Sequence, residues 1–313
     1  MFLTNLPSEL IIVIADFLRP KDLNALVKTA SSFANLLGLR LLDRGLADPK
    51  LEILLWAAAK GDEKIISKIL TRAQHKRVNI PPQVKDSMLM TAVLHNRVGH
   101  LEYLIRTVGA NLSAMVSHKY SLLPRAALHE AAEQGNKAAT QKLLELGAVV
   151  NAIDAGGLSS LHYAVWKPER EDASEGEAWD TDEELEYGVN SIAILRLLLG
   201  HGALTEVVEP DRQQTPLLWA SIDGDTEAIS LLLDHGANIA ASDDEGCTAL
   251  HFAAESGKHE TVQLLVDKGA DAFAFDYSAY TPLDVAASAS VRKILRQAGA
   301  LTGAELGREL ERL

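Results

Sequence analysis

The amino-acid sequence predicts an all-α protein built from stacked helix pairs. The first observation is a repeat of about thirty-three residues: His129 and His162 are 33 positions apart, and Leu218, His251 and Asp284 keep the same spacing. The second is the pattern inside each repeat, where an apolar helix ends at glycine and a leucine-rich helix follows. One such helix pair cannot bury its apolar face alone, so neighbouring pairs must stack.

Start and stop signals place the first helix of each repeat. Thr215 and Thr281 are expected to cap a helix whose first residue is the following proline, because that position needs no N–H donor. Gly135, Gly224 and Gly257 are expected to end it. Polar turns containing Asp, Gly or Asn then lead from each second helix to the next repeat.

The segment DDEGCTALHFAAESGKHETVQLLVDKGAD (243–271) contains these signals in order, and units that begin at Arg125, Gln214 and Asp276 share most of them. The pattern resembles ankyrin repeats over residues 51–300, with about seven units, the last of them a short cap. This resemblance implies a solenoid of stacked helix pairs with short β-turn connections, and a role in protein–protein interaction. Residues 301–313 are expected to form an extra helix or a tail.

Composition narrows the possible partners and compartments. The chain has 313 residues, of which 47% are apolar, and a single cysteine, Cys247, so it cannot form an internal disulfide. We therefore expect a reducing location, the cytoplasm or the nucleus. Residues 127–313 carry 33 acidic and 13 basic side chains, which argues against nucleic acid as a partner. No segment is long and apolar enough to span a membrane, so we expect no membrane partner.

The sequence contains no constellation typical of catalysis. The HEAAE segment (129–133) lacks the second histidine of a zinc-protease helix, and nucleotide-binding glycine motifs are absent. The recurring histidines His129, His162 and His251 would bind a metal only if they converged, whereas stacked repeats separate them. We expect each ring to bond backbone in the turn between repeats. The prediction is a protein without catalytic residues, metal or cofactor, which is not an enzyme.

An aromatic residue follows the repeat histidine or its equivalent in four units, at Trp56, Tyr163, Trp219 and Phe252. In ankyrin repeats this position faces the concave groove, so the resemblance implies a target-binding stripe. Asp223 and Glu255, near the ends of the first helices, would give it an acidic rim that suits a basic target. The alternative is that the rings pack between repeats.

The unit that begins at Asp154 is interrupted by an insert, KPEREDASEGEAWDTDEELEYG (167–188), with ten acidic and two basic residues. Such a composition cannot bury enough apolar surface to fold alone, which predicts a loop. Its tryptophan among acids suggests a docking site for a basic partner, formed by Trp179, Asp180, Asp182 and Glu183. The alternative is a solvated insertion without a role.

The N-terminal stretch LPSELIIVIADFL (6–18) is apolar on nearly every side of a predicted helix. It lacks a basic flank and is too short to span a bilayer, so it predicts neither a signal peptide nor an anchor. Two further short helices are expected before residue 50. A helix that is apolar all round must be buried, and so small a module offers little core. Part of the helix should therefore face the repeat array or another protein.

This N-terminal segment resembles an F-box, with the matching positions Leu6, Pro7, Leu10, Ile14, Leu18 and Leu23. It lacks the late tryptophan often found where Phe33 stands. The resemblance implies that residues 1–50 are a three-helix module that docks on a Skp-type adaptor and, through it, a cullin. The whole chain then reads as a substrate-recognition subunit of a cullin-based ubiquitin ligase, monomeric when alone, with the repeats holding an unknown target. The alternative is an ankyrin scaffold whose N-terminal helices cap the array.

Overall fold

The computed structural model describes residues 51–118, 121, 123–166 and 191–310, and there the chain consists of helices, turns and isolated β-bridges. The chain divides into two compact units, Met1–Leu112 and Ser113–Leu313. This boundary lies inside the residues that the sequence assigns to one repeat array. The predicted module of residues 1–50 and the acidic insert 167–188 lie outside the described residues.

The described part of the first unit holds two helix pairs. α4 packs against both α5 and α6. Asp62 begins α5 by accepting a hydrogen bond from the Ile65 amide at 3.0 Å, and Arg97 donates its Nε–H to the Ala59 carbonyl at 2.8 Å, which ties the two pairs together. The bounds are α4 Glu52–Lys60, α5 Glu63–Lys76, α6 Pro82–Leu94, η2 Val98–His100, α7 Leu101–Tyr103 and η3 Leu104–Val108.

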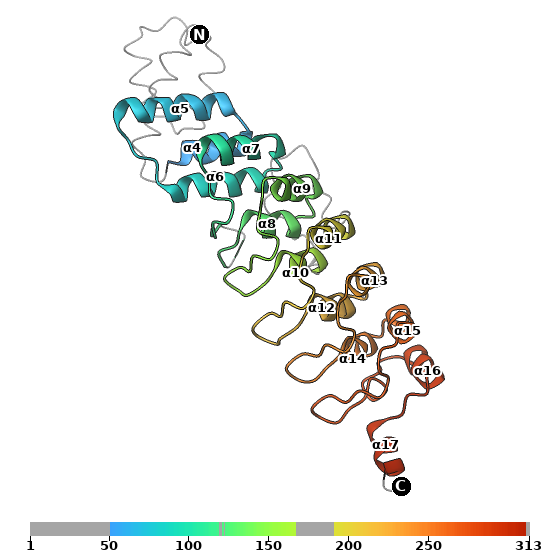
Figure 1. Ribbon diagram of the computed structural model, residues 1–313. Helices are drawn as coiled ribbons and strands as arrows, with labels where there is room; N and C mark the ends of the chain where they lie inside the picture. The colour runs from blue at the N-terminus through green and yellow to red at the C-terminus, as the bar shows by residue number, and fades with distance from the viewer. Residues whose placement is uncertain (1–50, 119–120, 122, 167–190, 311–313) are drawn as a thin grey trace, which may run out of the picture. The chain divides into compact units, whose positions relative to one another are not determined.

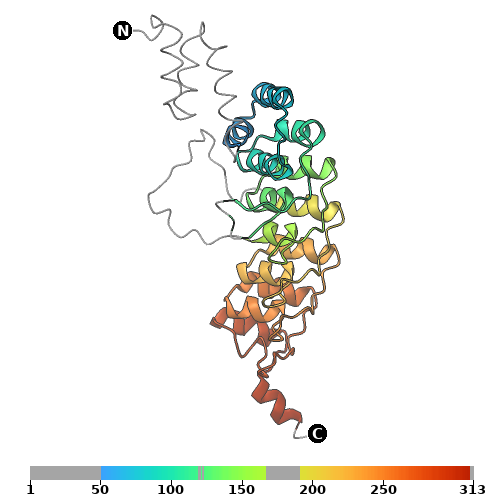
Figure 2. The same ribbon diagram turned by 90° about the vertical axis from the view of Figure 1, so that its left-hand side faces the viewer.

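In the second unit, helix pairs follow one another as two layers. The first helices α8, α10, α12 and α14 pack side by side, and the second helices α9, α11, α13, α15 and α16 form the other layer (Figures 1 and 2). The bounds are α8 Ala127–Glu133, α9 Lys137–Glu145, α10 Ser160–Val165, α11 Ser191–Gly200, α12 Pro216–Asp223, α13 Thr226–Asp234, α14 Ala249–Glu255, α15 His259–Asp267, α16 Ala289–Gln297 and α17 Gly303–Leu310.

The core between the layers is aliphatic. Leu218, Leu232, Ala253 and Leu265 are fully buried, and the alanine lets α12 and α14 approach closely. Burying a large aliphatic side chain contributes about 1.5–3 kcal/mol, so each pair depends on the neighbour that covers it.

The predicted helix signals are largely confirmed. Thr215 accepts a hydrogen bond from the Leu218 amide at 3.4 Å, and Pro216 is the first residue of α12. Gly135, Gly224 and Gly257 follow or cap first helices with φ of +69°, +79° and +68°, a conformation that favours glycine.

In the last repeat, the prediction that Thr281 caps a helix is wrong, because Thr281 and Pro282 begin a turn. The Thr281 hydroxyl donates to the Leu301 carbonyl at 2.9 Å, and the Ala287 amide bonds across to the Ala254 carbonyl of the preceding repeat at 3.0 Å. The Thr281 hydroxyl and the Ala287 amide thus bond to other segments of the chain. Within the described residues, α16 is the only full helix of this last repeat.

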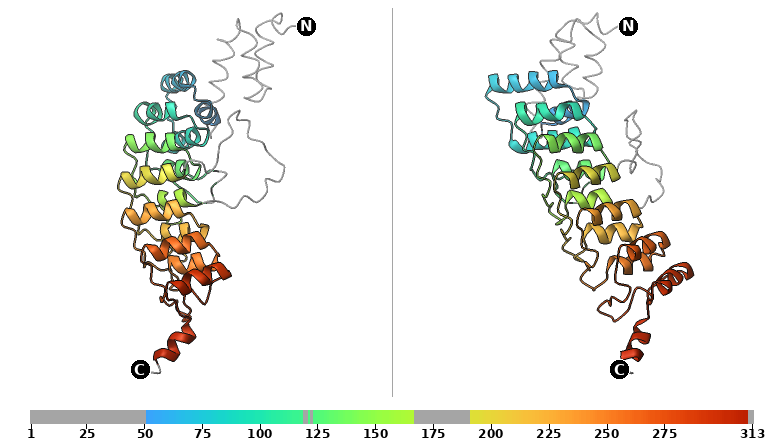
Figure 3. Two further views of the ribbon diagram at one scale, coloured as in Figure 1. Left: turned by 90° about the vertical axis from the view of Figure 1, so that its right-hand side faces the viewer. Right: turned by 45° about the vertical axis from the view of Figure 1, so that its right-hand side comes forward.

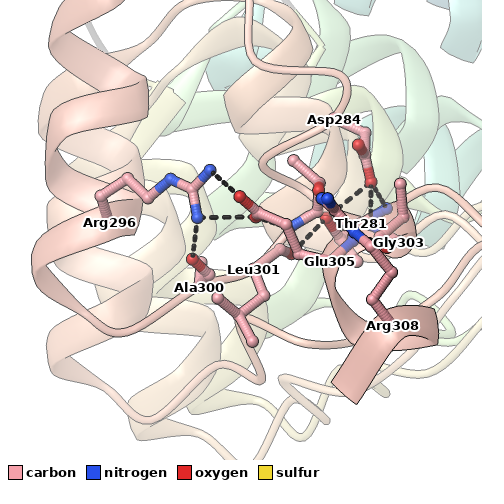
Figure 4. Close-up of polar contacts among 10 residues, drawn as sticks. Thr281, Asp284, Arg296, Ala300, Leu301, Gly303, Glu305 and Arg308 are labelled. Atoms are coloured by element: carbon pink, nitrogen blue, oxygen red, sulfur yellow. Dashed lines mark hydrogen bonds and ion pairs between the residues drawn. The ribbon is translucent and has the colours of Figure 1, made fainter. Parts of the chain in front are cut away.

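Residues 303–310 form the extra helix α17, which lies beyond the last helix pair (Figure 3). Arg296 of α16 donates to both carboxylate oxygens of Glu305, at 2.7 and 2.9 Å, and Glu305 also accepts from the Thr302 amide at 2.8 Å (Figure 4). The bond from Arg296, with that from Thr302, lowers the pKa of Glu305 to about 2. The helix is thus held by directed polar contacts at its first turn.

Each recurring histidine links its repeat to the next, as the sequence predicts. The Nδ1 of His129, His162 and His251 lies 3.2 Å from the backbone amide three residues earlier, which can only donate. Nε2 therefore carries the proton and donates to a carbonyl of the loop that leads to the next first helix, that of Ala152, Gln214 or Tyr280, at 3.0–3.3 Å. The three rings are neutral structural links between repeats.

In the last repeat, Asp284 stands at the position that the recurring histidine occupies in other repeats. Its carboxylate accepts from the Thr281 amide at 2.9 Å and from the Gly303 amide at 2.8 Å, and it shares the single Thr281 hydroxyl proton, at 2.9 Å, with the Leu301 carbonyl (Figure 4). A carboxylate accepts on both sides, whereas the histidines accept on one side and donate on the other. Asp284 therefore links to the following segment by accepting from a backbone amide, whereas each histidine donates to a backbone carbonyl.

The neutral histidines predict a stability that falls in mild acid. Burial lowers the pKa of His162 to about 4, and it lowers the pKa of His129 and His251 as well. Between pH 6.5 and 4 the unfolded chain binds protons that the folded chain does not, so the free energy of unfolding decreases as the pH falls. Between pH 7 and pH 5, His162 alone should account for about 2 kcal/mol of this loss.

The measurement is urea unfolding of the wild type and His162→Leu at both pH values. Leucine is the matched replacement because Leu218 occupies the equivalent position in another repeat. The variant should lose about 2 kcal/mol less than the wild type between the two pH values. Equal losses in the two proteins would show that His162 is not held neutral.

Candidate protein-binding surface

The predicted aromatic stripe is placed on the first helices of the repeats, where its members differ in exposure. Trp219 of α12 and Phe252 of α14 are half-buried and lie on adjacent, packed helices. The Trp219 ring meets the His162 ring edge-on, with centroids 5.2 Å apart. Trp219 therefore both packs on the preceding repeat and keeps accessible surface. Trp56 of α4 is half-buried too, but belongs to the first unit.

Tyr163 lies inside the stack, with 8% of its surface exposed. Its hydroxyl donates to Asp154 at 2.6 Å, and the Arg125 guanidinium lies 5.0 Å from its ring centroid. Burial, followed by the bond to Asp154, raises the pKa of Tyr163. These contacts favour the packing alternative at this position, while partner binding at Trp219 and Phe252 stays a prediction.

The predicted acidic rim is formed by the last residues of two adjacent first helices. Asp223 ends α12 and is half-buried, and Glu255 ends α14 and is exposed. Their charges lie within one helical turn of Trp219 and Phe252 along the same helices. The other predicted binding residues lie outside the described residues; they are Leu6, Pro7, Leu10, Ile14, Leu18, Leu23, Trp179, Asp180, Asp182 and Glu183.

A buried ionic cluster around Arg125 was not predicted from the sequence. Arg125, only 4% exposed, pairs with Glu130 at 2.6 Å and with Glu133. Glu130 also accepts from His118 at 2.9 Å and from Gln134 at 2.7 Å. Three charged groups and two polar ones thus share a site at the first repeat of the second unit.

The cluster shifts its carboxyl groups in opposite directions. Burial by itself would raise the pKa of Glu130, but the hydrogen bond from His118 and the charge of Arg125 outweigh it, and the pKa is lowered. For Glu133 burial dominates and the pKa is raised, although Arg125 opposes this. Burial would lower the pKa of Arg125, but its two carboxylate partners raise it. The guanidinium therefore stays charged and organises the cluster.

Four exposed aromatic side chains occur in one inter-repeat loop, which we call the aromatic finger (residues 271–280). They are Phe273, Phe275, Tyr277 and Tyr280. The sequence analysis passed over them because they belong to a turn and not to the helical position it followed. The signal was present as local density, since four of the chain's sixteen aromatic residues fall within eight positions.

Chemistry-bearing groups elsewhere in the described chain are dispersed. No group of three His, Cys, Asp or Glu side chains within the described ranges could hold a metal ion. Burial, with the nearby charge of Asp243, raises the pKa of Cys247 to about 12, so this thiol is protonated at neutral pH. No helix among the described residues has the length and apolar character required to cross a membrane.

Comparison with known proteins agrees with the geometry. Residues 128–167 match a family model described as ankyrin repeats in many copies, and residues 186–276 and 241–300 match one for ankyrin repeats in three copies. The ankyrin repeat domain of Bcl-3, a member of the IkappaB family, superposes with a TM-score of 0.60 at 27% identity, which covers 78% of this chain and 97% of that one.

Curated relatives share only part of their length with this chain. Palmitoyltransferase ZDHHC17 of Danio rerio is 33% identical over 185 residues, which cover 55% of this chain and 29% of that protein. Palmitoyltransferase AKR1 of Kluyveromyces lactis is 27% identical over 202 residues, or 64% of this chain and 23% of that protein. The chain thus spans less than a third of the length of these two relatives.

The buried cluster predicts a large penalty for removing its cation. Arg125→Leu leaves the buried Glu130 and the half-buried Glu133 without the guanidinium, and losing one partner of a buried ion pair costs about 3–5 kcal/mol. Urea unfolding measures this loss. The control is Arg125→Leu combined with Glu130→Gln and Glu133→Gln, which removes all three charges and should recover more than half of it. A loss below about 1 kcal/mol for Arg125→Leu would contradict the ionic description.

Proposed function

We propose that this chain, an ankyrin-repeat protein with an all-α fold, binds another protein through the layer of first helices in its second unit. The observation that carries the proposal is the pair Trp219 and Phe252. Both side chains are half-buried at the same repeat position on packed helices, and both are near acidic helix ends. Aromatic residues with accessible surface on a rigid support are typical anchors of protein interfaces.

The partner should offer a basic and partly apolar segment. Asp223 and Glu255 provide negative charge beside the two rings, and complementary charge accelerates association more than it tightens the final complex. The chain would contribute binding and no chemistry, as a non-enzymatic interaction protein. The palmitoyltransferase relatives do not change this proposal, because the shared part is less than a third of their length.

Trp219→Ala should weaken target binding and cost only modest stability. A fully buried tryptophan costs about 3–5 kcal/mol when it is truncated. Trp219 keeps accessible surface, so its loss should stay below about 3 kcal/mol in a urea melt. A larger loss would assign the ring to packing and remove it from the binding surface.

Binding itself can be tested by site-specific photocrosslinking in cells of the native source. A benzophenone amino acid replaces Trp219 or Phe252, and for comparison Glu260, which is exposed on the outer helix α15. The proposal expects the same crosslinked partner from the first two positions and not from the third. Crosslinking that is equal at all three, or absent at the first two, would contradict it.

A finer proposal concerns residues 1–50, which lie outside the described structure and outside the family matches given above. Their sequence supports an F-box that docks on a Skp-type adaptor, through Leu6, Pro7, Leu10 and Ile14. The supporting observation is the motif together with a predicted helix that is apolar all round. In that case the repeats would bring a target to a cullin-based ubiquitin ligase, and the chain would act by proximity.

Leu10→Asp/Ile14→Asp should weaken binding of the adaptor more than tenfold. Each buried aliphatic side chain contributes about 1.5–3 kcal/mol, and 1.4 kcal/mol is tenfold. The measurement is a titration of purified Skp-type adaptor against the wild type and this variant, with folding checked by circular dichroism. Trp219→Ala is the control and should bind the adaptor as the wild type does. If the wild-type chain does not bind the adaptor, the ubiquitin-ligase proposal is wrong and only the scaffold function remains.

A further inference from the structure

The aromatic finger exposes four large aromatic side chains to solvent. The exposed fractions are 80% for Tyr277, 54% for Tyr280, 47% for Phe275 and 42% for Phe273. In the rest of the described chain, Trp166 is the one other aromatic residue with comparable exposure. A gathering of exposed apolar side chains of this kind marks an interaction site.

The finger is held in one conformation by its own hydrogen bonds. Asp276 Oδ1 accepts from the amides of Ser278 at 2.9 Å and Tyr280 at 2.8 Å, and the Asp276 amide donates to the Tyr280 carbonyl at 2.9 Å. The same carbonyl accepts from Nε2 of His251 at 3.2 Å. The rings are therefore displayed on an ordered loop, so binding would cost little additional ordering.

The finger also leans on the tip of the preceding loop, which we call the acidic tip (residues 244–246). The Tyr277 amide donates to the Glu245 carbonyl at 2.9 Å. A Cβ placed on Gly246 would lie 2.9 Å from Cδ1 of Tyr277, so the ring edge touches this glycine. The carboxylates of Asp244 and Glu245 belong to residues adjacent to these contacts, and both side chains are exposed.

Most of the exposed charged residues beside the acidic tip are also acidic. The Asp244 amide donates to the Arg212 carbonyl at 3.0 Å, which places the loop before α12, with Asp211, beside the acidic tip. Asp271 adds an exposed carboxylate at the start of the finger. Arg212 is the only cation among these exposed residues, so the surface repels phosphate groups and attracts ammonium or guanidinium groups.

We propose that the aromatic finger and the acidic tip together bind an extended peptide segment in which lysine or arginine alternates with apolar residues. A cation over the Tyr277 ring would interact with its π-face and with the carboxylates of Asp244 and Glu245. Apolar neighbours would pack on Phe275 and Tyr280. This surface is built from loops, and it is separate from the first-helix residues Trp219 and Phe252.

The test uses the full chain and a fluorescein-labelled peptide of four Lys-Leu-Thr repeats, followed by fluorescence anisotropy. Tyr277→Ser should lower the affinity about threefold to tenfold, and Tyr277→Phe should leave it unchanged because the π-face remains. Asp244→Asn/Glu245→Gln should lower it by a similar factor. All these side chains are exposed, so circular dichroism should show unchanged folding.

Matched controls separate this site from general attraction to an acidic chain. Glu227→Gln/Glu260→Gln removes the same number of negative charges from the second helices α13 and α15. This variant should not change the affinity by more than twofold. A peptide of Glu-Leu-Thr repeats should not bind.

Three results would overturn the proposal. One is an equal loss of affinity with Glu227→Gln/Glu260→Gln, which would show general attraction to negative charge. Another is full affinity in Tyr277→Ser. The third is sedimentation showing that the wild-type chain self-associates through the finger while the peptide fails to bind, in which case a second copy is the occupant.

Discussion

The hydrogen bond from a buried side chain of one repeat to the backbone of the next is the interaction on which the second unit depends. A helix pair of this size exposes an apolar face on each side, so hydrophobic burial forces pairs together but does not fix their register. The neutral rings of His129, His162 and His251 fix it at three places, because each joins its own helix start to a carbonyl of the loop that leads to the next first helix. Leu218 stands at the equivalent position of the repeat that contains α12, where the bond from the Asp244 amide to the Arg212 carbonyl joins the two loops instead. Asp284 makes the equivalent link to the final segment.

The hydrogen bonds between repeats also hold residues of the exposed loops. The carbonyl that His251 contacts belongs to Tyr280, a member of the aromatic finger, so a buried contact holds an exposed one in place. Amide-to-carbonyl bonds between successive loops add to it, as from Ala155 to Pro124 and from Asp244 to Arg212. Binding residues can thus stand on loops that are hydrogen-bonded to neighbouring repeats, and such an arrangement limits the ordering cost of binding.

Local signals predicted much of this fold, and contacts between distant residues explain what they missed. The cap at Thr215, the helix-ending Gly224 and the histidine links all follow from short patterns that recur at the repeat period. The segment at Thr281 begins with the same Thr-Pro-Leu sequence but forms a turn, and its hydroxyl contacts Leu301, twenty residues later, which no local pattern predicts. The Arg125 cluster was missed for another reason: its members, from His118 to Gln134, are close in sequence, but no local pattern shows that their side chains are buried against one another.

The most direct test is native-state hydrogen exchange at the amides of Tyr277 and Tyr280, compared with amides of α14. These two groups donate to Glu245 and Asp276 in a loop that is otherwise exposed. If repeat-to-repeat links make the loops as fixed as the helices, both amides should be protected to within about tenfold of the helical ones. Exchange at the rate of an unstructured chain would show a mobile finger, and the ordered binding surface would then not exist.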